Sequence, residues 1–417
     1  SPVAYEPDLA MSLNTLSLRL SGVGRREEAV APIVEAVEIG RRWTKVSPVA
    51  YEPDLAMSLN TLSLRLSGVG RLEEAVAPIV EAVEVYRRLA KVSPVADEPY
   101  LAGSLHNLSN QLSGVGRLEE AVAPIVEAVG IYRRLAKVSP DAYEPDLAMS
   151  LNTLSNQLSG VGRLEEAVAP IVEAVGIRRR LAEVNPAAYE PALAGSLNDL
   201  SKQLSGVGRR ERAVPPIVEA VGIRRRLAKV NPAAYEPALA SSLNNLSILL
   251  SGVGRREEAV VPIVEAVEIY RRLAKVSPVA CEPDLAGSLS NVSILLSGVG
   301  RREEAVAPIV EAVEIYRRLA KVSPAAYEPD LASSLHTLSI LLPGVGQWEE
   351  AVAPIVEAVE IYRRLAKVDP AAYEPYLASS LHTLSILLSG VGRREEEAVA
   401  AMQEAQEIRR RFETDKF

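Results

Sequence analysis

Leucines recur at a helical spacing in the first part of the chain. Four of them are separated by four, three and four residues, which places them on one face of a helix: Leu9, Leu13, Leu16 and Leu20. A strand would need strict alternation of apolar and polar residues, and the residues between these leucines break it. The pattern predicts a helix that begins near Pro7 and ends at the Ser-Gly-Val-Gly turn of residues 21–24, where glycine can form a left-handed cap.

A second amphipathic segment follows this turn. Acidic residues open it at Glu27 and Glu28, and basic residues close it at Arg41 and Arg42, which suits the helix dipole at both ends. Its apolar residues between 29 and 39 cover more than one face, which predicts a helix that is buried on two sides.

Prolines complicate this pattern at two places. Pro32 lies inside the second segment, so the segment can be interpreted as two short helices or as one bent helix. We prefer one bent helix, because the apolar spacing continues through the proline without changing phase. Residues 47–52 carry a Ser-Pro and a Glu-Pro, and we expect a tight, extended connector there because residues before proline avoid the helical conformation.

The whole pattern repeats every 46 residues. The phrase SPVAYEPDLAMSLNTLSLRLSGVG begins at Ser1 and again, unchanged, at Ser47, and variants of it follow at the same spacing. The nine copies are residues 1–46, 47–92, 93–138, 139–184, 185–230, 231–276, 277–322, 323–368 and 369–417. Each copy reads as one helix-turn-helix unit that touches mainly its neighbours. We therefore predict an all-α fold, an α-solenoid that runs as a single domain over residues 1–417.

The composition argues against several classes of protein. The chain has 417 residues, a formal net charge of −8 and 48% apolar residues, which is too apolar for a disordered chain. No uncharged apolar run approaches the roughly 18 residues of a membrane span. The acidic balance argues against nucleic acid and anionic membranes as partners. Cys281 is the only cysteine, so no intramolecular disulfide can form, which favours a reducing compartment such as the cytoplasm.

The order of large and small residues within each copy resembles the tetratricopeptide-repeat signature. The first copy carries it at Leu13, Leu16, Ser17, Leu20, Gly24, Ala29, Ile33 and Ala36. Residues 12–17, followed by Gly-Arg-x-Glu-Glu-Ala-Val-x-Pro, are similar to the long repeats of kinesin light chains and of bacterial and fungal STAND and CHAT signalling proteins. The resemblance implies a right-handed superhelix with the first helices on its concave side, and a peptide or protein as the usual ligand. The copies depart from the family in exceeding its common length of about 34 residues.

Variation among the copies concentrates on the polar side of the first helix. The position of Asn14 and its equivalents, here the asparagine position, holds all three histidines of the chain. The position of Leu18 and its equivalents, here the isoleucine position, changes from leucine to amide and lysine and then to isoleucine from the sixth copy onward. Amide side chains can both donate to and accept from a peptide backbone. The predicted groove residues are Asn14, Asn60, His106, Asn110, Asn152, Asn156, Asn198, Lys202, Asn244, His336 and His382.

Two other interpretations of this variation stay open. An exposed helix face can vary freely while the core does not, without binding anything. The apolar pairs of the later copies, such as Ile248 and Leu249, can instead thicken the packing between successive first helices. We favour packing for Leu249 and leave Ile248 undecided.

No arrangement of residues indicates catalysis, a cofactor or a metal. His336 and His382 fall on neighbouring first helices, which pack about 8–10 Å apart, and no cysteine or acidic cluster completes a zinc site. The Glu27-Glu28 pair recurs in nearly every copy, as charges at a helix start do. The Ser-Gly-Val-Gly-Arg turn lacks the Lys-Ser/Thr of a phosphate-binding loop. We expect a protein that is not an enzyme.

The two ends of the chain differ. Gln403 and Gln406 replace valines of earlier copies, so the last helix is expected to have the polar outer face of a terminal repeat. The first copy has no such device, and we expect missing upstream sequence or self-association through this uncapped copy. The sequence thus favours a scaffold that binds a protein or peptide; the alternative is a structural protein whose arrays polymerise into a filament.

Overall fold

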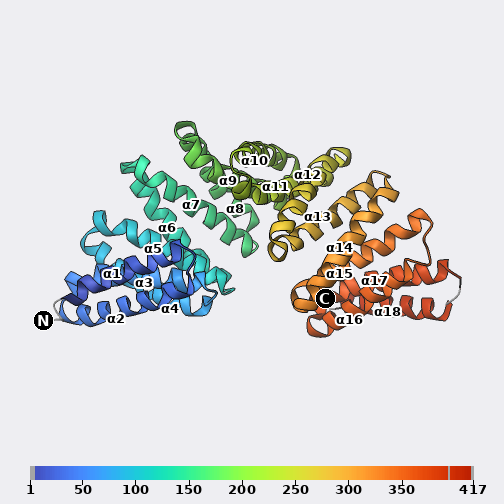
Figure 1. Cartoon of the computed structure of the whole chain (residues 1–417), viewed down its shortest axis with the longest axis horizontal. Helices are drawn as coiled ribbons and strands as arrows, with labels where there is room; N and C mark the ends of the chain where they lie inside the picture. Colours follow the sequence, from blue (N-terminus) through green and yellow to red (C-terminus); the bar gives the residue numbers. More distant parts are fainter. Residues whose placement is uncertain (1–4, 393–394, 415–417) are drawn as a thin grey trace. The chain divides into compact units, whose positions relative to one another are not determined.

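The computed structural model describes residues 5–392 and 395–414, and this part of the chain is helical without any strand (Figure 1). The first helices of the nine copies are α1 (Glu6–Gly22), α3 (Pro48–Gly68), α5 (Pro94–Gly114), α7 (Pro140–Gly160), α9 (Pro186–Gly206), α11 (Pro232–Gly252), α13 (Pro278–Gly298), α15 (Pro324–Leu341) and α17 (Pro370–Gly390). The second helices are α2 (Val30–Val46), α4 (Leu72–Val92), α6 (Leu118–Val138), α8 (Leu164–Val184), α10 (Arg210–Val230), α12 (Arg256–Val276), α14 (Arg302–Val322), α16 (Val352–Val368) and α18 (Glu395–Thr414). Two short 3₁₀ segments, Glu27–Ala29 and Leu342–Val345, complete the described elements.

The expectation of an extended connector between copies is wrong. A single residue, Ser47, separates α2 from α3, and α3 already begins at Pro48. Proline suits the first helical position because it lacks only an amide that has no intrahelical partner there. The amides of Ala50 and Tyr51 donate to the Ser47 carbonyl at 3.2 and 3.3 Å, so the segment is helical from its start. Pro53 lies inside α3, where it removes one backbone hydrogen bond without ending the helix.

The second helix continues through its internal proline, as the unbroken apolar spacing predicts. In α4 a single helix of 21 residues contains Pro78, and α6 contains Pro124 in the same way. The interpretation as two short helices is therefore wrong for these copies.

The turn inside each copy depends on its second glycine. This glycine has a positive φ, between +67° and +85°, in all nine copies, and no other type of residue in the described chain has one. In the second copy Gly70 has φ +81°, and the amide of the following Arg71 donates to the Leu66 carbonyl at 2.9 Å. The left-handed turn lets the second helix fold back directly against the first.

From α1 to α9 and from α11 to α18, each helix packs against its neighbours in the chain. α3 contacts α2 and α4, and α13 contacts α12 and α14. Successive first helices such as α3 and α5, or α11 and α13, also contact each other. In the described residues, no two successive second helices approach as closely. The helices therefore form an all-α solenoid whose first helices make the more tightly packed side.

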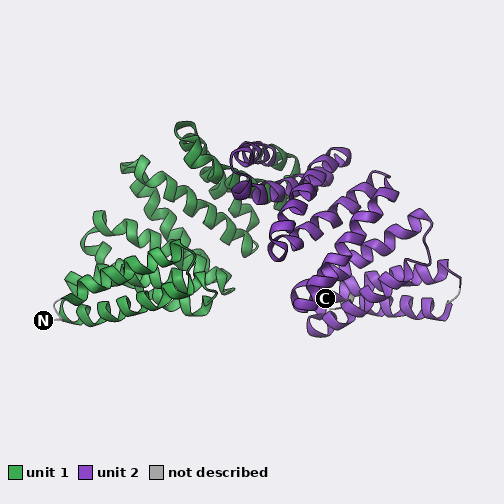
Figure 2. Cartoon of the chain, viewed as in Figure 1, with its two compact units in different colours: residues 1–216 green, residues 217–417 purple. Residues whose placement is uncertain are grey.

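The chain divides into two compact units, residues 1–216 and 217–417, and the boundary falls inside α10 (Figure 2). Each unit consists of hairpins packed in chain order. The predicted single domain over residues 1–417 and the predicted handedness of the superhelix stay predictions.

Coverage by the preceding copy decides which leucines are buried. Leu55 and Leu62 of α3 are 5% and 8% exposed, whereas the equivalent Leu9 and Leu16 of α1 are 44% and 47% exposed. The second helices bury their apolar residues on both sides, and Ile79 is completely inaccessible. At the other end, Gln406 is exposed where its equivalents are buried valines. That the last copy serves as a terminal cap stays a prediction.

Ion pairs add a weaker link between neighbouring copies. Arg87 pairs with Glu127 of the next second helix, and Arg88 pairs with Glu52 of its own first helix at 2.8 Å. Both kinds of pair recur in most copies. Because the arginines are about half exposed, each pair contributes about 1 kcal/mol or less.

The left-handed turn gives a first prediction. Gly116→Ala should lower stability by about 1–2 kcal/mol, because Gly116 has φ +78° and a side chain is strained there. Gly114→Ala is the matched control: this glycine ends α5, and a Cβ there would stand 4.0 Å from Leu72. We expect the control to be neutral or slightly stabilising in thermal melts followed by circular dichroism. Equal losses in both variants would contradict the role of the turn.

Coverage by neighbouring copies gives a second prediction. Leu62→Ala should destabilise the chain by about 2–5 kcal/mol, because it opens a cavity between copies. Leu16→Ala, at the equivalent but exposed position, should cost far less. Urea denaturation curves of the two variants measure the difference. Similar shifts of the two midpoints would mean that the preceding copy does not supply the burial of Leu62.

Candidate functional site

Residues at the asparagine position form hydrogen bonds between neighbouring first helices. His106 Nδ1 lies 3.1 Å from Ser150 Oγ of the next copy, and His336 Nδ1 lies 2.8 Å from Ser380 Oγ of the next copy. His106 is buried and His336 is half-buried. These histidines thus join adjacent helices.

The asparagines at this position make equivalent contacts. Asn60 Oδ1 accepts a hydrogen bond from Asn107 Nδ2 of the next copy at 3.0 Å. Asn244 Oδ1 accepts from Asn291 Nδ2 at 3.0 Å and from Ser288 Oγ at 3.4 Å. These four residues at the asparagine position therefore link adjacent first helices, and part of their hydrogen-bonding capacity is already used.

Asn152 is the centre of a larger polar cluster. Its Oδ1 accepts from Ser196 Oγ at 2.7 Å and from Arg178 Nη1 at 3.2 Å, and its Nδ2 donates to Asp199 Oδ2 at 2.8 Å. Burial lowers the pKa of Arg178, and the nearby Asp199 carboxylate acts in the opposite direction. Asn198, beside this cluster on α9, is half-buried.

This cluster includes a half-buried arginine, Arg178, which the sequence pattern did not single out. Its position, here the tyrosine position, comprises Gly40, Tyr86, Tyr132, Arg178, Arg224, Tyr270, Tyr316 and Tyr362. Arg224 donates to the Ala238 carbonyl at 2.9 Å, much as Arg178 donates to the Ala192 carbonyl at 3.0 Å. The signal was present in the sequence as the replacement of tyrosine by arginine in two consecutive copies.

The asparagine position is incompletely paired in the first and last copies. Asn14 is 5% exposed, yet its Oδ1 has no hydrogen-bond partner. The next copy has Thr61 where the third, sixth and seventh copies supply an amide, and Thr61 donates instead to the Met57 carbonyl at 3.0 Å. His382 Nδ1 is likewise buried without a partner. No later first helix follows His382 in the described chain.

The buried histidines are uncharged near neutral pH. Burial lowers the pKa of His106 and of His336, so each ring offers one donor and one acceptor there. Within residues 5–392 and 395–414, no three His, Cys, Asp or Glu side chains are placed to hold a metal ion together.

The isoleucine position lies on the exposed face of the first helices. Asn110, Asn156 and Lys202 are exposed in the unit of residues 1–216. In the unit of residues 217–417 the same position is half exposed in four consecutive copies, at Ile248 (51%), Ile294 (54%), Ile340 (56%) and Ile386 (50%). These isoleucines do not fill the packing between helices.

The residue after the isoleucine position behaves in the opposite way. Leu249 is 6% exposed, which confirms that it packs between helices. Its equivalents in the middle copies are Gln111, Gln157 and Gln203, and these are buried as well. Of these two successive residues, from the third copy onward, the one at the isoleucine position faces solvent and the next one packs between helices.

None of the helices in the described chain combines the length and the apolar character that crossing a bilayer requires.

Several solved structures are similar in fold to this chain. The apo form of RapI superposes with a TM-score of 0.58 at 13% identity, over 97% of this chain and 99% of that one. BtubC (BKLC) from P. vanneervenii gives a TM-score of 0.48 at 23% identity, over 60% and 92% of the two chains. A Podosopora anserina putative kinesin light chain with nearly identical TPR-like repeats gives 0.42 at 21%, over 55% and 98%. No curated protein matches the chain by sequence.

A sequence model of the tetratricopeptide repeat matches six segments that together cover more than half of the chain. The segments are residues 9–42, 55–93, 101–141, 239–277, 285–323 and 331–371. They follow the 46-residue period and coincide with the helical hairpins of the structure. The chain therefore belongs to the tetratricopeptide repeat family.

Proposed function

We propose that the protein is a non-catalytic scaffold that binds a segment of a partner protein on the exposed face of its first helices. Tetratricopeptide repeats commonly mediate protein–protein interactions, which supports the general class. The observation that carries the proposal is the row of half-exposed isoleucines: Ile248, Ile294, Ile340 and Ile386.

An apolar row of this kind costs free energy unless something covers it. Each isoleucine that becomes fully buried contributes about 1.5–3 kcal/mol relative to full exposure, so about half of that is available at half exposure. Contiguous exposed apolar surface on a folded protein marks a site of interaction. One isoleucine in each of four copies offers evenly repeated contacts to one elongated ligand.

The surroundings of the row favour an uncharged, apolar segment. On the same helices the asparagine position and the residue after it are amides, hydroxyls or histidines, among them Asn245, Asn291 and Thr337. No acidic or basic side chain stands at the isoleucine position of these four copies. A ligand segment with regularly spaced apolar side chains and hydrogen-bonding groups between them matches this chemistry.

In the third, fourth and fifth copies the same face is polar. We propose that exposed Asn110, Asn156 and Lys202 contact the ligand there, through amide hydrogen bonds and one positive charge. Residues at the asparagine position, such as His106 and Asn152, contribute to ligand binding mainly by holding the first helices in register.

A displayed peptide library selected on the purified chain tests this function. The selected peptides should be rich in apolar residues, and Ile294→Ser combined with Ile340→Ser should weaken their binding about tenfold or more. The matched control is Val322→Ser combined with Val368→Ser, because these valines are 87% and 86% exposed but lie at the ends of second helices. Fluorescence polarisation measures both affinities.

Equal affinity of the two double variants would contradict the proposed face. Long fibres of the unmodified chain in negative-stain micrographs, together with no selected peptide, would favour the alternative of a structural polymer.

A further inference from the structure

Among the first eight copies, the tyrosine position is filled in seven and empty in the first. The five tyrosine rings are only 3–6% exposed: Tyr86, Tyr132, Tyr270, Tyr316 and Tyr362. Arg178 and Arg224 occupy the position in two further copies and are half-buried. Gly40 supplies no side chain, so the first copy lacks a group that the later copies bury.

The side chain at this position reaches the first helix of its own copy. The Tyr132 hydroxyl lies 3.6 Å from where a Cβ on Gly103 would stand, and the Tyr316 hydroxyl lies 3.5 Å from the same point at Gly287. Arg178 reaches further along its first helix and donates to Asn152 Oδ1. Arginine from this position therefore reaches the asparagine position, and the tyrosine hydroxyls lie beside the residue one helical turn before it.

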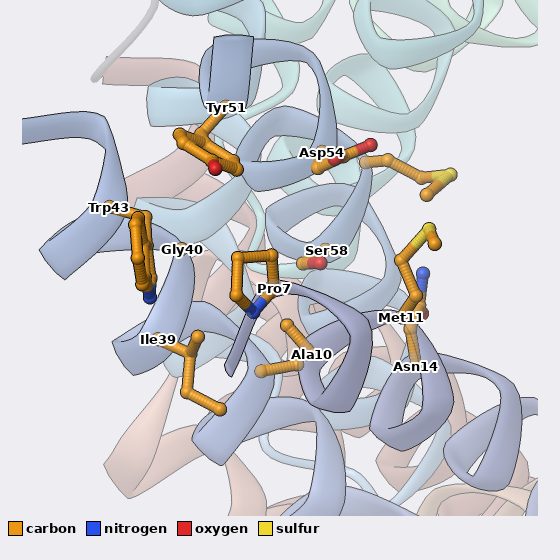
Figure 3. A pocket seen from close by; sticks show the side chains of 12 residues that line it. Pro7, Ala10, Met11, Asn14, Ile39, Gly40, Trp43, Tyr51, Asp54 and Ser58 are labelled. Carbon is orange, nitrogen blue, oxygen red and sulfur yellow. The ribbon is translucent and has the colours of Figure 1, made fainter. Parts of the chain in front are cut away.

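In the first copy the vacated space is a pocket between α1, α2 and α3 (Figure 3). Its walls include Pro7, Met11, Ile39, Trp43 and Tyr51. The enclosed space is about 20 Å³, so the flexible side chains of Met11 and Met57 must move aside for a ring to enter. Most of the lining is apolar, as a ring-binding site requires.

Two contacts fix the aromatic wall of the pocket. Trp43 Nε1 donates to Glu6 Oε2 at 3.1 Å, and the Trp43 ring lies 5.3 Å from the Tyr51 ring. Met11 and Met57 also line the pocket and are 51% and 39% exposed, so the pocket opens to solvent beside them.

Asn14 gives the pocket a hydrogen-bond acceptor without a donor. It lines the pocket, is 95% buried, and its Oδ1 has no partner. The equivalent Asn152 Oδ1 accepts from Arg178, which comes from the tyrosine position of that copy. An unpaired buried acceptor is unfavourable, so a ligand that donates to Asn14 gains from both burial and the new hydrogen bond.

The neighbouring copies indicate which donor fits. Where the position is arginine, the facing residue of the next first helix is alanine, as in the contact of Arg178 with the Ala192 carbonyl. Where it is tyrosine, the facing residue is aspartate or tyrosine: Asp146 stands near Tyr132, and Tyr100 stacks on Tyr86 at 5.7 Å. The pocket beside Gly40 contains Asp54 at this place and so has the surroundings of the tyrosine copies.

We propose that this pocket binds the tyrosine side chain of a peptide or protein partner. The ring lies against Trp43 and the two methionines, and its hydroxyl donates to Asn14 Oδ1. The site belongs to the unit of residues 1–216 and does not depend on the isoleucine row of the other unit.

Methyl NMR of the chain labelled at methionine tests the proposal, with 4-methylphenol as the probe. The chain has four methionines, and Met11 and Met57 line the pocket whereas Met149 and Met402 do not. Met149 is a close control because it is equivalent to Met11 in a copy whose tyrosine position is filled by Arg178. We expect saturable shifts of Met11 and Met57 alone, and weaker binding of toluene, which lacks the hydroxyl.

Two variants distinguish binding in the pocket from nonspecific binding of the probe. Gly40→Tyr should abolish the shifts by filling the pocket; its Cβ would stand 3.2 Å from Leu55 Cδ1, so its folding is checked by circular dichroism. Asn14→Ala keeps the space but should weaken 4-methylphenol roughly fivefold and remove its advantage over toluene. No shift at Met11 and Met57, equal shifts at all four methionines, or an unchanged preference in Asn14→Ala would overturn the proposal.

A second probe tests the source of the phenol. N-acetyltyrosinamide should produce the same shifts as 4-methylphenol, and N-acetylphenylalaninamide should bind more weakly. Binding of 4-methylphenol without binding of N-acetyltyrosinamide would mean that the pocket takes a free phenol, and the assignment to a tyrosine side chain would be wrong.

Discussion

Burial of each hairpin against the hairpin before it is the interaction on which the rest of this structure depends. A single copy is too small to cover both sides of its second helix, and the exposed Leu9 and Leu16 show what a first helix looks like when no copy covers it. The same leucines one copy later are almost completely buried. Stability is thus approximately the sum of hairpin and interface terms, as in other repeat arrays. Because the interface is the same in every copy, its residues hardly vary.

This constraint leaves a small set of positions free to differ, and those positions determine what the protein can contact. Each copy contributes one residue at such a position, so the equivalent residues of successive copies form a row on the surface. The side chains at that position therefore determine the character of the whole row. At the isoleucine position the row is polar in the third to fifth copies and apolar from the sixth copy onward. At the tyrosine position a missing side chain leaves a pocket in one copy, with Asn14 as its buried acceptor. Both features arise from single replacements in an otherwise regular frame.

The sequence was sufficient to predict the hairpins, the glycine turn and the continuous second helix, because these depend on local spacing and on backbone preferences. It misplaced the start of the first helix: a proline pair disfavours helix locally, but Pro48 stands at the first helical position, where its missing amide costs nothing. The asparagine position was predicted as part of a groove, which stays a prediction, and the sequence did not show that several of its residues, such as Asn60 and His106, bond to the next copy. Spacing within one helix identifies a face but does not show how close the neighbouring helix comes. The pocket at Gly40 was overlooked because the pattern records side chains that are present, whereas this site arises from an absent one.

Removal of one whole copy tests the central claim most directly. If each hairpin is covered only by its neighbours, deletion of residues 277–322 joins two compatible interfaces and should leave a cooperatively melting, fully helical chain that is modestly less stable. Deletion of residues 277–299 removes only the first helix of that copy and should disrupt the array, because the remaining second helix then meets the wrong face. Circular dichroism melts of the two deletions provide the measurement. Equal damage from both deletions, or tolerance of the shorter one, would contradict the account.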